Sequence, residues 1–222
     1  MNSVGESFAW AFRDPAWPGK MLLQGLIAII PIIGWIAMNG WLMMAFENAR
    51  AGKNELPPAG FHLERGIGIW LVLLLYGIVT GLPGGLITGL GFATSGHTAS
   101  AFNTSSPLIA FGYLVSFAGS LFFRFLIPSL IVHTFHGGLS GGFDVQRVWS
   151  LATFNVSNSV VAGLIIFVAS VIGGLGFVCC IGFIFTVPYE NTINAGAAAW
   201  FERAQAAPAP PAAPAPPLPP TA

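Results

Sequence analysis

One long stretch without charged residues, from Gly66 to Phe92, constrains the fold more than any other feature. As a helix it would be about 40 Å long, which exceeds the ~30 Å hydrocarbon core of a bilayer. Glycines recur at every fourth position within it and would fall nearly in line on one helix face. They are Gly77, Gly81, Gly85 and Gly89. We therefore expect a transmembrane helix with a glycine zipper, which lets a second helix of the same or another chain approach closely.

The composition of the whole chain argues against an ordinary soluble domain. Only 7% of the 222 residues are charged, 55% are hydrophobic and the mean hydropathy is +0.75. A soluble domain carries about a quarter charged residues, so this chain has too few to cover a water-facing surface. The net charge is zero, which argues against a nucleic-acid partner because such a partner requires a basic face. We expect an all-α, polytopic transmembrane helical bundle with membrane lipids as partners.

Four long apolar segments are present, and helix-breaking residues lie near the middle of the first and of the fourth. The segments are residues 21–46, 66–92, 107–135 and 156–188. Pro31 and Gly34 interrupt the first segment, which favours a kinked single span over a re-entrant hairpin. Gly173, Gly174 and Gly176 lie at the centre of the fourth, which is either one tilted helix or two short helices that meet there. We therefore expect four spans, some of them broken.

The two ends of the chain differ from this transmembrane domain, which we place at residues 21–203. Residues 1–20 mix aromatic and polar side chains, and we expect them to lie at the membrane interface, where tryptophan is enriched. Residues 204–222 are rich in alanine and proline and predict a disordered tail. Basic residues are nearly balanced between the two sides of the membrane, so their distribution does not decide the orientation.

Arg124 is the most informative charged residue, because it lies well inside the third apolar segment. A charged side chain at membrane depth costs about 2.5–3.5 kcal/mol on insertion scales, so it needs a partner, water or the interface. Arg124 either faces the bundle interior, where it binds an anionic lipid headgroup or substrate or pairs with Glu190, or extends to the interface. Together with Asn39, His133 and His136 it makes up our set of candidate anion-binding or lipid-binding residues.

No pattern in the sequence predicts catalysis or a bound cofactor. His133 and His136 share a helix face and have a spacing that suits metal ligands, but no Cys, Asp or Glu joins them at suitable spacing. Cys179 and Cys180 are adjacent in an apolar run and are expected to pack as small hydrophobes. Nucleophile elbows, phosphate loops and dinucleotide fingerprints are not found. We therefore expect no enzymatic activity, no metal and no cofactor.

Several short motifs resemble those of one known family. They are Asp14-Pro-Ala-Trp17, Asn39-Gly40-Trp41, Asn48-Ala-Arg50-Ala-Gly52, Leu56-Pro57 and Phe143-Asp144-Val145-Gln146-Arg147. Over about residues 8–203 the chain resembles a family of bacterial and archaeal multi-pass membrane proteins known only as a domain of unknown function. Trp41 stands where that family tends to have tyrosine. The resemblance implies transmembrane and interfacial helices in a prokaryotic cytoplasmic membrane, and it implies no activity and no site residue.

Three classes of function fit these observations. A non-enzymatic scaffold or assembly component, which pairs with itself or with other membrane proteins, agrees best with the glycine face and with the missing catalytic pattern. A small transporter or a lipid-binding or anion-binding protein would need a polar cavity lined by Gln24, Asn39, Arg124 or the histidines. An intramembrane enzyme would need acids or histidines that converge at one depth. We expect the scaffold, with the binding protein as the alternative.

Overall fold

The computed structural model describes residues 3–94, 99–178 and 181–206. Within these ranges the chain forms seven α-helices, two short 3₁₀ helices and no strand, which confirms the all-α fold class. The 3₁₀ helices are η1 (Val4–Phe8) and η2 (Trp10–Arg13). The α-helices are α1 (Trp17–Ala28), α2 (Ile33–Arg50), α3 (Leu63–Thr94), α4 (Ala99–Phe143), α5 (Val145–Phe154), α6 (Val156–Val178) and α7 (Phe183–Ala206).

Three helical segments of the described chain are long and apolar enough to cross a membrane. They are Leu63–Thr94 in α3, Pro107–Phe143 in α4 and Val156–Val178, which is α6. Four spans are therefore not confirmed. The first apolar segment does not form the kinked single span that we expected, because it is divided between α1 and α2. Pro31 lacks a backbone N–H, and Ile32 has a positive φ of 63°, so the chain turns here and does not continue as a helix.

The fourth apolar segment also breaks at an unexpected place. α6 continues without interruption through Gly173, Gly174 and Gly176 and ends at Val178. Gly173 and Gly176 pack against α7, whereas Gly174 faces open space, and the helix ends after all three. Cys179 and Cys180 lie outside the described residues.

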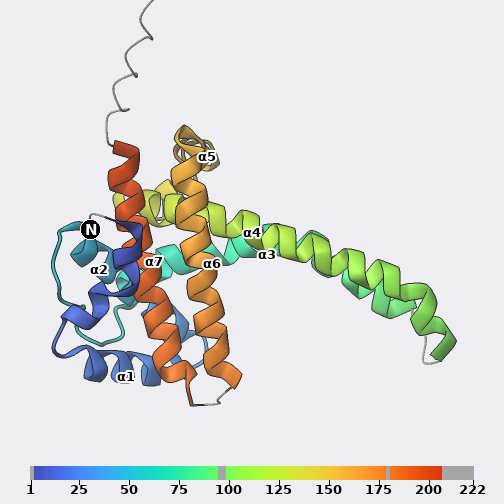
Figure 1. The fold of residues 1–222 in the computed structure, drawn as a ribbon, viewed down its shortest axis with the longest axis horizontal. Coiled ribbons are helices and arrows are strands. Elements are labelled where there is room, and N and C mark those ends of the chain that lie inside the picture. The colour runs from blue at the N-terminus through green and yellow to red at the C-terminus, as the bar shows by residue number, and fades with distance from the viewer. Residues whose placement is uncertain (1–2, 95–98, 179–180, 207–222) are drawn as a thin grey trace, which may run out of the picture.

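α7 returns alongside α6 in the opposite direction and forms a hairpin with it (Figure 1). It extends to Ala206, so residues 204–206 of the predicted tail are helical. The remainder of that tail, from residue 207 onward, lies outside the described residues.

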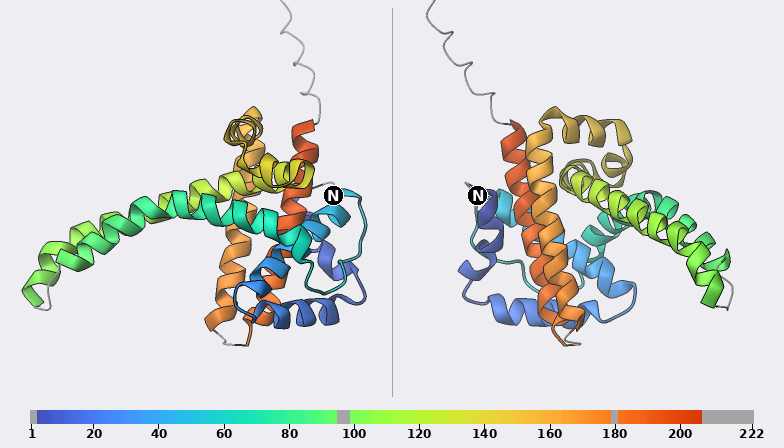
Figure 2. Two further views of the ribbon diagram at one scale, coloured as in Figure 1. Left: turned by 180° about the vertical axis from the view of Figure 1, so that it is seen from behind. Right: turned by 45° about the vertical axis from the view of Figure 1, so that its right-hand side comes forward.

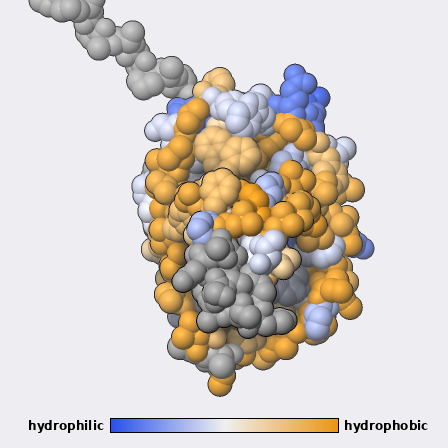
Figure 3. Space-filling model, turned by 90° about the vertical axis from the view of Figure 1, so that its right-hand side faces the viewer, coloured by the Kyte–Doolittle hydropathy of each residue, from blue (hydrophilic) through white to orange (hydrophobic). Residues whose placement is uncertain are grey.

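A second and longer hairpin, made of α3 and α4, crosses the first (Figures 1 and 2). Its end near Leu63 and Phe143 packs on the rest of the protein, and Phe117 and Phe122 of α4 still contact Phe167 of α6 and Trp149 of α5. The other end projects as a curved arm, which we define as residues 77–94 and 99–122. Seen along this arm from its tip, the surface is largely hydrophobic (Figure 3). An exposed apolar surface of this extent is typical of contact with lipid or with another protein.

The two helices of the arm pack through a seam of small residues. A Cβ atom added to a seam glycine would collide with the facing helix. The facing pairs are Gly84 with Ser116, Gly91 with Ile109, Gly112 with Thr88 and Gly119 with Thr80. Along each helix these residues are three or four positions apart, as in a coiled coil, and small side chains let membrane helices approach closely.

The predicted glycine zipper does not form this contact. A Cβ atom added to Gly81, Gly85 or Gly89 has no described atom within 4 Å, and at Gly77 it meets only the Phe123 ring, at 3.9 Å. Residues spaced strictly four apart are displaced by about 40° around the helix axis at each step. Residues spaced alternately three and four apart stay on the side that faces a partner helix. The prediction that these four glycines form a packing face within the chain is therefore wrong, whereas their use as a contact face between chains stays a prediction.

The N-terminal segment packs on α7. Trp10 is buried, and its Nε1 donates a hydrogen bond to the carbonyl oxygen of Thr192 at 3.0 Å. The hydroxyl of Tyr189 donates to the carbonyl oxygen of Phe8 at 2.8 Å. We expected the tryptophans of residues 1–20 at the membrane interface, but Trp10 lies inside the protein, where its ring and its N–H both find partners.

Candidate functional site

Arg124 lies opposite Glu190 where the two hairpins cross. α4 carries Arg124, α7 carries Glu190, and 3.9 Å separates Arg124 Nη1 from Glu190 Oε1. The two side chains are 27% and 20% exposed. Because this distance is too long for a direct hydrogen bond, the pair attracts through charge alone. Among the described residues, no acceptor forms a hydrogen bond with the guanidinium group.

Two features of α6 fix the Glu190 carboxylate. The hydroxyl of Ser170 donates to Glu190 Oε1 at 2.9 Å, and it also lies 2.9 Å from the carbonyl oxygen of Ile166. Gly173, one turn further along α6, faces the other carboxylate oxygen so closely that a Cβ atom would collide with it. The carboxylate is therefore held against the backbone of α6 and is not free to swing toward Arg124.

A cavity of about 450 Å³ opens beside this ion pair. α2, α3, α4, α6 and α7 all contribute to its wall. Its polar lining comes from Asn39, Arg124, Ser170, Glu190, Asn191 and Asn194, and its aromatic lining from Trp35, Trp70, Phe123 and Phe177. A volume of this size, apolar walls and a few convergent polar groups are typical of a small-molecule site.

Asn194 contributes an unpaired acceptor to the cavity. Its side chain is only 8% exposed, and its Oδ1 atom has no hydrogen-bond partner in the described chain. A buried polar atom without a partner costs about 1–3 kcal/mol. Asn194 lies one helical turn after Glu190, so both side chains face the same side of α7. The cavity therefore offers an acceptor that the protein itself does not use.

The structure brings two of the four predicted site residues together and leaves two elsewhere. Asn39 and Arg124 line the cavity, whereas His133 and His136 do not. His136 contacts Glu202 at 2.7 Å, near the end of α7. Gln24, which we expected at such a cavity, is buried and accepts a hydrogen bond from the backbone N–H of Gly60 at 3.0 Å. Within the described chain, no cluster of three or more His, Cys, Asp or Glu side chains could hold a metal ion.

Sequence reasoning missed Ser170 and Asn194. The spacing of Glu190 and Asn194 was a usable signal, because residues four apart share a helix face. Ser170 gave no such signal, since only the packing of α6 on α7 brings it to Glu190.

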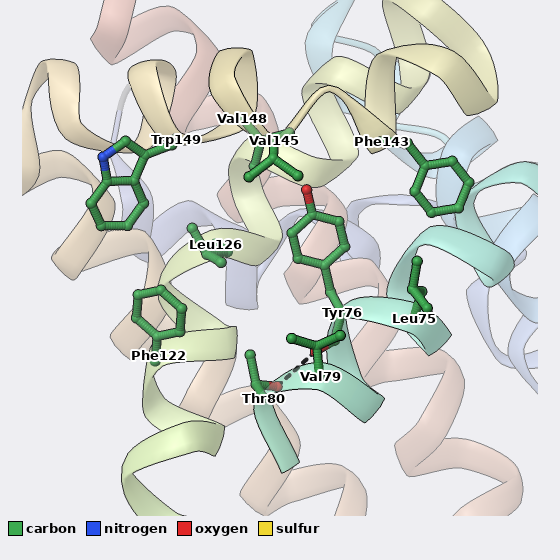
Figure 4. A pocket seen from close by; sticks show the side chains of 10 residues that line it. All are labelled: Leu75, Tyr76, Val79, Thr80, Phe122, Leu126, Phe143, Val145, Val148 and Trp149. Carbon is green, nitrogen blue, oxygen red and sulfur yellow. Dashed lines mark hydrogen bonds between the residues drawn. The ribbon is translucent and has the colours of Figure 1, made fainter. Parts of the chain in front are cut away.

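A second hollow lies between α3, α4 and α5 and is almost entirely apolar (Figure 4). Its volume is about 380 Å³, and the ten side chains around it include Trp149, Phe122 and Leu126. The hydroxyl of Tyr76 points into the region near Val145 and is buried without a hydrogen-bond partner. None of the described residues that line this hollow is charged, so it suits a hydrocarbon chain better than a polar ligand.

The contacts of Asp14 give several residues of the sequence motifs a structural role. Its carboxylate accepts hydrogen bonds from the backbone N–H groups of Ala16 and Leu56, both at 2.8 Å, and from Lys20 Nζ at 2.7 Å. Lys20 also donates to the carbonyl oxygen of Leu56 at 2.6 Å. Burial raises the pKa of Asp14, but the hydrogen bonds from Lys20 and the two N–H groups outweigh burial and hold the pKa below its ordinary value of 3.8. These residues are structural: they tie the N-terminal segment to the loop before α3.

A family model described as "Protein of unknown function (DUF4013)" matches residues 23–182. The chain belongs to this family. The resemblance to a family of unknown function is thereby confirmed. No curated protein and no solved structure matches the chain. The DUF4013 region includes Asn39, Arg124 and Ser170 but ends before α7, so the cavity is built from that region and from the helix that follows it.

Proposed function

We propose that this DUF4013 protein is an integral membrane protein that binds a small polar ligand, or a lipid headgroup, in the cavity at Arg124. One observation carries this function: Arg124 and Glu190 line a single cavity at 3.9 Å from one another, beside the unpaired Oδ1 of Asn194. A pair with a purely structural role would be expected to close to about 2.7–2.9 Å. Here the geometry leaves both charges available to a ligand.

The surroundings of Arg124 support a membrane setting for this site. Arg124 lies within Pro107–Phe143, one of the three segments that are long and apolar enough to cross a bilayer. Because a charge at membrane depth costs about 2.5–3.5 kcal/mol, the position of Arg124 in an apolar helix calls for a function that uses it. Ionisable residues inside spans typically face cavities and mark ligand or ion pathways. We place the protein in the cell membrane on these grounds.

We favour binding over catalysis at this cavity. The hydroxyl of Ser170 lies 2.9 Å from the carbonyl oxygen of Ile166 in its own helix, as well as from Glu190. Serines in apolar helices commonly make this bond to the preceding turn. Because its single O–H is shared between the Ile166 carbonyl and the Glu190 carboxylate, Ser170 serves to position the carboxylate and is not placed as an activated nucleophile.

A scaffold that assembles through the arm is the second candidate. Two observations favour it. The α3 face that carries Gly81, Gly85 and Gly89 has open space at these glycines in the described chain, and it lies on an arm that projects from the rest of the protein (Figure 2). Such a face would let the arm of a second copy, or another membrane helix, approach closely.

Replacement of Arg124 by leucine tests the binding function. We expect the amount of polar ligand or lipid that co-purifies with Arg124→Leu to be about tenfold lower than with the unmodified protein, because a charge-assisted contact is lost. Native mass spectrometry of the purified protein measures this retention. The matched control is Arg147→Leu, since Arg147 is 74% exposed on α5 and pairs with Asp144 outside the cavity. Equal retention by both variants, with intact helicity by circular dichroism, would contradict a binding site at Arg124.

A further inference from the structure

We propose, on the basis of the binding function above, that the cavity selects a zwitterion: one molecule that carries an ammonium group and an anionic group such as a phosphate. Phosphoethanolamine has this chemistry, either as a free molecule or as the headgroup of phosphatidylethanolamine. Arg124 would bind the anionic group, and Glu190 with Asn194 would bind the ammonium group.

The charges in the cavity favour a ligand with both signs. Arg124 and Glu190 are the charged residues among its described lining, and they lie 3.9 Å apart. A purely anionic ligand at Arg124 would lie equally near the Glu190 carboxylate, and in surroundings of low dielectric that repulsion is strong. A purely cationic ligand meets the same conflict at Arg124. A zwitterion satisfies both residues at once.

The acceptors for the ammonium group lie together on α7. Glu190 and the unpaired Oδ1 of Asn194 are one helical turn apart and line the same cavity. An ammonium group has three N–H donors and no acceptor, so it matches one carboxylate and one amide oxygen. Ser170 and Gly173 hold the carboxylate on the α6 side, which keeps it away from Arg124 and ready for a second partner.

The donors for the anionic group lie on α4. The guanidinium of Arg124 is a planar fork with five N–H donors, and none of them forms a hydrogen bond within the described chain. Arginine binds phosphate and carboxylate groups through two parallel hydrogen bonds. The lining also includes Trp35 and Trp70, and indole rings can contribute favourable contacts to an ammonium group.

The test measures which ligands the full chain binds in nanodiscs. Free phosphoethanolamine is titrated by calorimetry against inorganic phosphate, as the anion alone, and ethylammonium, as the cation alone. Retention of phosphatidylethanolamine and of phosphatidylglycerol is compared in parallel by native mass spectrometry. We expect the zwitterion of one source or the other to bind at least about tenfold more tightly than the matched single-charge probe. Selective binding of phosphatidylethanolamine without phosphoethanolamine identifies a lipid, and binding of both identifies the headgroup chemistry itself.

Three variants test which residues bind the ammonium group and which bind the anionic group of the ligand. Glu190→Gln and Asn194→Leu should remove the preference for the zwitterion, and Glu190→Gln should leave phosphate or phosphatidylglycerol binding unchanged or stronger. Arg124→Gln should weaken binding of every anionic probe. Glu55→Gln, an exposed loop change, is the control and should alter nothing. If Arg124→Gln fails to fold, Arg124→Lys keeps the charge but loses the planar fork of N–H donors, and it should still weaken binding of every anionic probe.

Two contrary results are distinguishable. If the single-charge anion binds as tightly as the zwitterion and Glu190→Gln has no effect on either, the selection of zwitterions is wrong while the site at Arg124 stands. If no probe binds in a manner that depends on Arg124, both the zwitterion and the binding function are wrong.

Discussion

A single glycine decides where the most important carboxylate lies. Gly173 of α6 faces the Glu190 side chain with no room for a Cβ atom, and the atom in its way is the far end of that side chain. Glu190 would therefore be displaced by a methyl group at this position, while the α6 backbone could stay as it is. Gly174 beside it faces open space, so the two glycines have different roles.

We expect Gly173→Ala to weaken ligand binding at the cavity by about tenfold without loss of fold, because a charge-assisted contact is misplaced. Helicity should be equal or higher, since alanine is favoured over glycine inside a helix by roughly 0.5–1 kcal/mol. Calorimetry and circular dichroism measure the two effects. Gly174→Ala is the matched control and should bind normally. Normal binding by Gly173→Ala would show that the position of the carboxylate does not matter.

Asp14 is important for the stability of the fold, because its carboxylate joins η2, α1 and the loop before α3. Asp14→Asn keeps the shape but turns an N–H₂ group toward donors that need an acceptor. We expect a loss of about 1–3 kcal/mol in the free energy of unfolding, seen as a lower melting temperature in detergent. Glu55→Gln should melt as the unmodified protein does. An unchanged melting temperature for Asp14→Asn would contradict the structural role.

The pKa of Asp14 also predicts how stability depends on pH. Because the pKa is lower in the folded than in the unfolded protein, the contribution of Asp14 to stability is complete above its ordinary pKa of 3.8 and declines as the pH falls through the folded pKa. The melting temperatures of the unmodified protein and of Asp14→Asn should therefore converge below about pH 3.8. A constant difference down to strongly acidic pH would contradict the lowered pKa.

At the level of elements, the seam between α3 and α4 shows how small residues set the distance between helices. The backbone of α4 at Ser116 lies where a Cβ atom on Gly84 would be. Neighbouring Gly85 faces open space. The two positions differ by one residue in sequence and by about 100° around the helix.

We expect Gly84→Ala to destabilise the hairpin by about 1–3 kcal/mol, because the facing atoms include backbone that cannot move aside easily. Gly85→Ala should be neutral or slightly stabilising in the monomer. Thermal unfolding of the two variants in the same detergent measures the difference. Equal melting temperatures would mean that α3 and α4 do not meet along this seam. A loss of oligomers in Gly85→Ala, by crosslinking, would instead support assembly through the open face.

The sequence predicted helices well and their partners less well. The absence of charge in residues 66–92 was sufficient to predict α3, because an uncharged apolar run of that length is typical of a membrane-spanning helix and of few other structures. The glycine spacing did not reveal the contact face, since α3 carries several glycines and the geometry of α4 selects among them. Pro31 marked an interruption in the sequence but did not reveal whether it would kink one helix or separate two, and the continuity of α6 at Gly173 depends on packing that no local pattern records. Arg124 was found because a charge in an apolar run is conspicuous, whereas Asn194 and Ser170 are not.

At the level of the whole molecule, the site exists because two hairpins cross. Five helices that lie far apart in the sequence supply its lining, and no single segment contains it. The arm, by contrast, depends on its environment: its outer side chains, such as Leu86 and Leu114, are 60% and 62% exposed. In water this surface would be strongly unfavourable, while among lipid tails it is at no disadvantage. The proposed membrane function therefore requires that the arm is surrounded by lipid.

Electron paramagnetic resonance of nitroxide labels tests that requirement most directly. Labels are placed at Leu86 and Leu114 on the arm and at exposed Lys53 in the loop before α3, in reconstituted protein with Cys179 and Cys180 replaced. We predict that molecular oxygen, which concentrates in the bilayer, relaxes the two arm labels, and that a water-soluble nickel chelate relaxes only the label at Lys53. Arm labels as accessible to the nickel chelate as Lys53 would contradict a lipid-embedded arm.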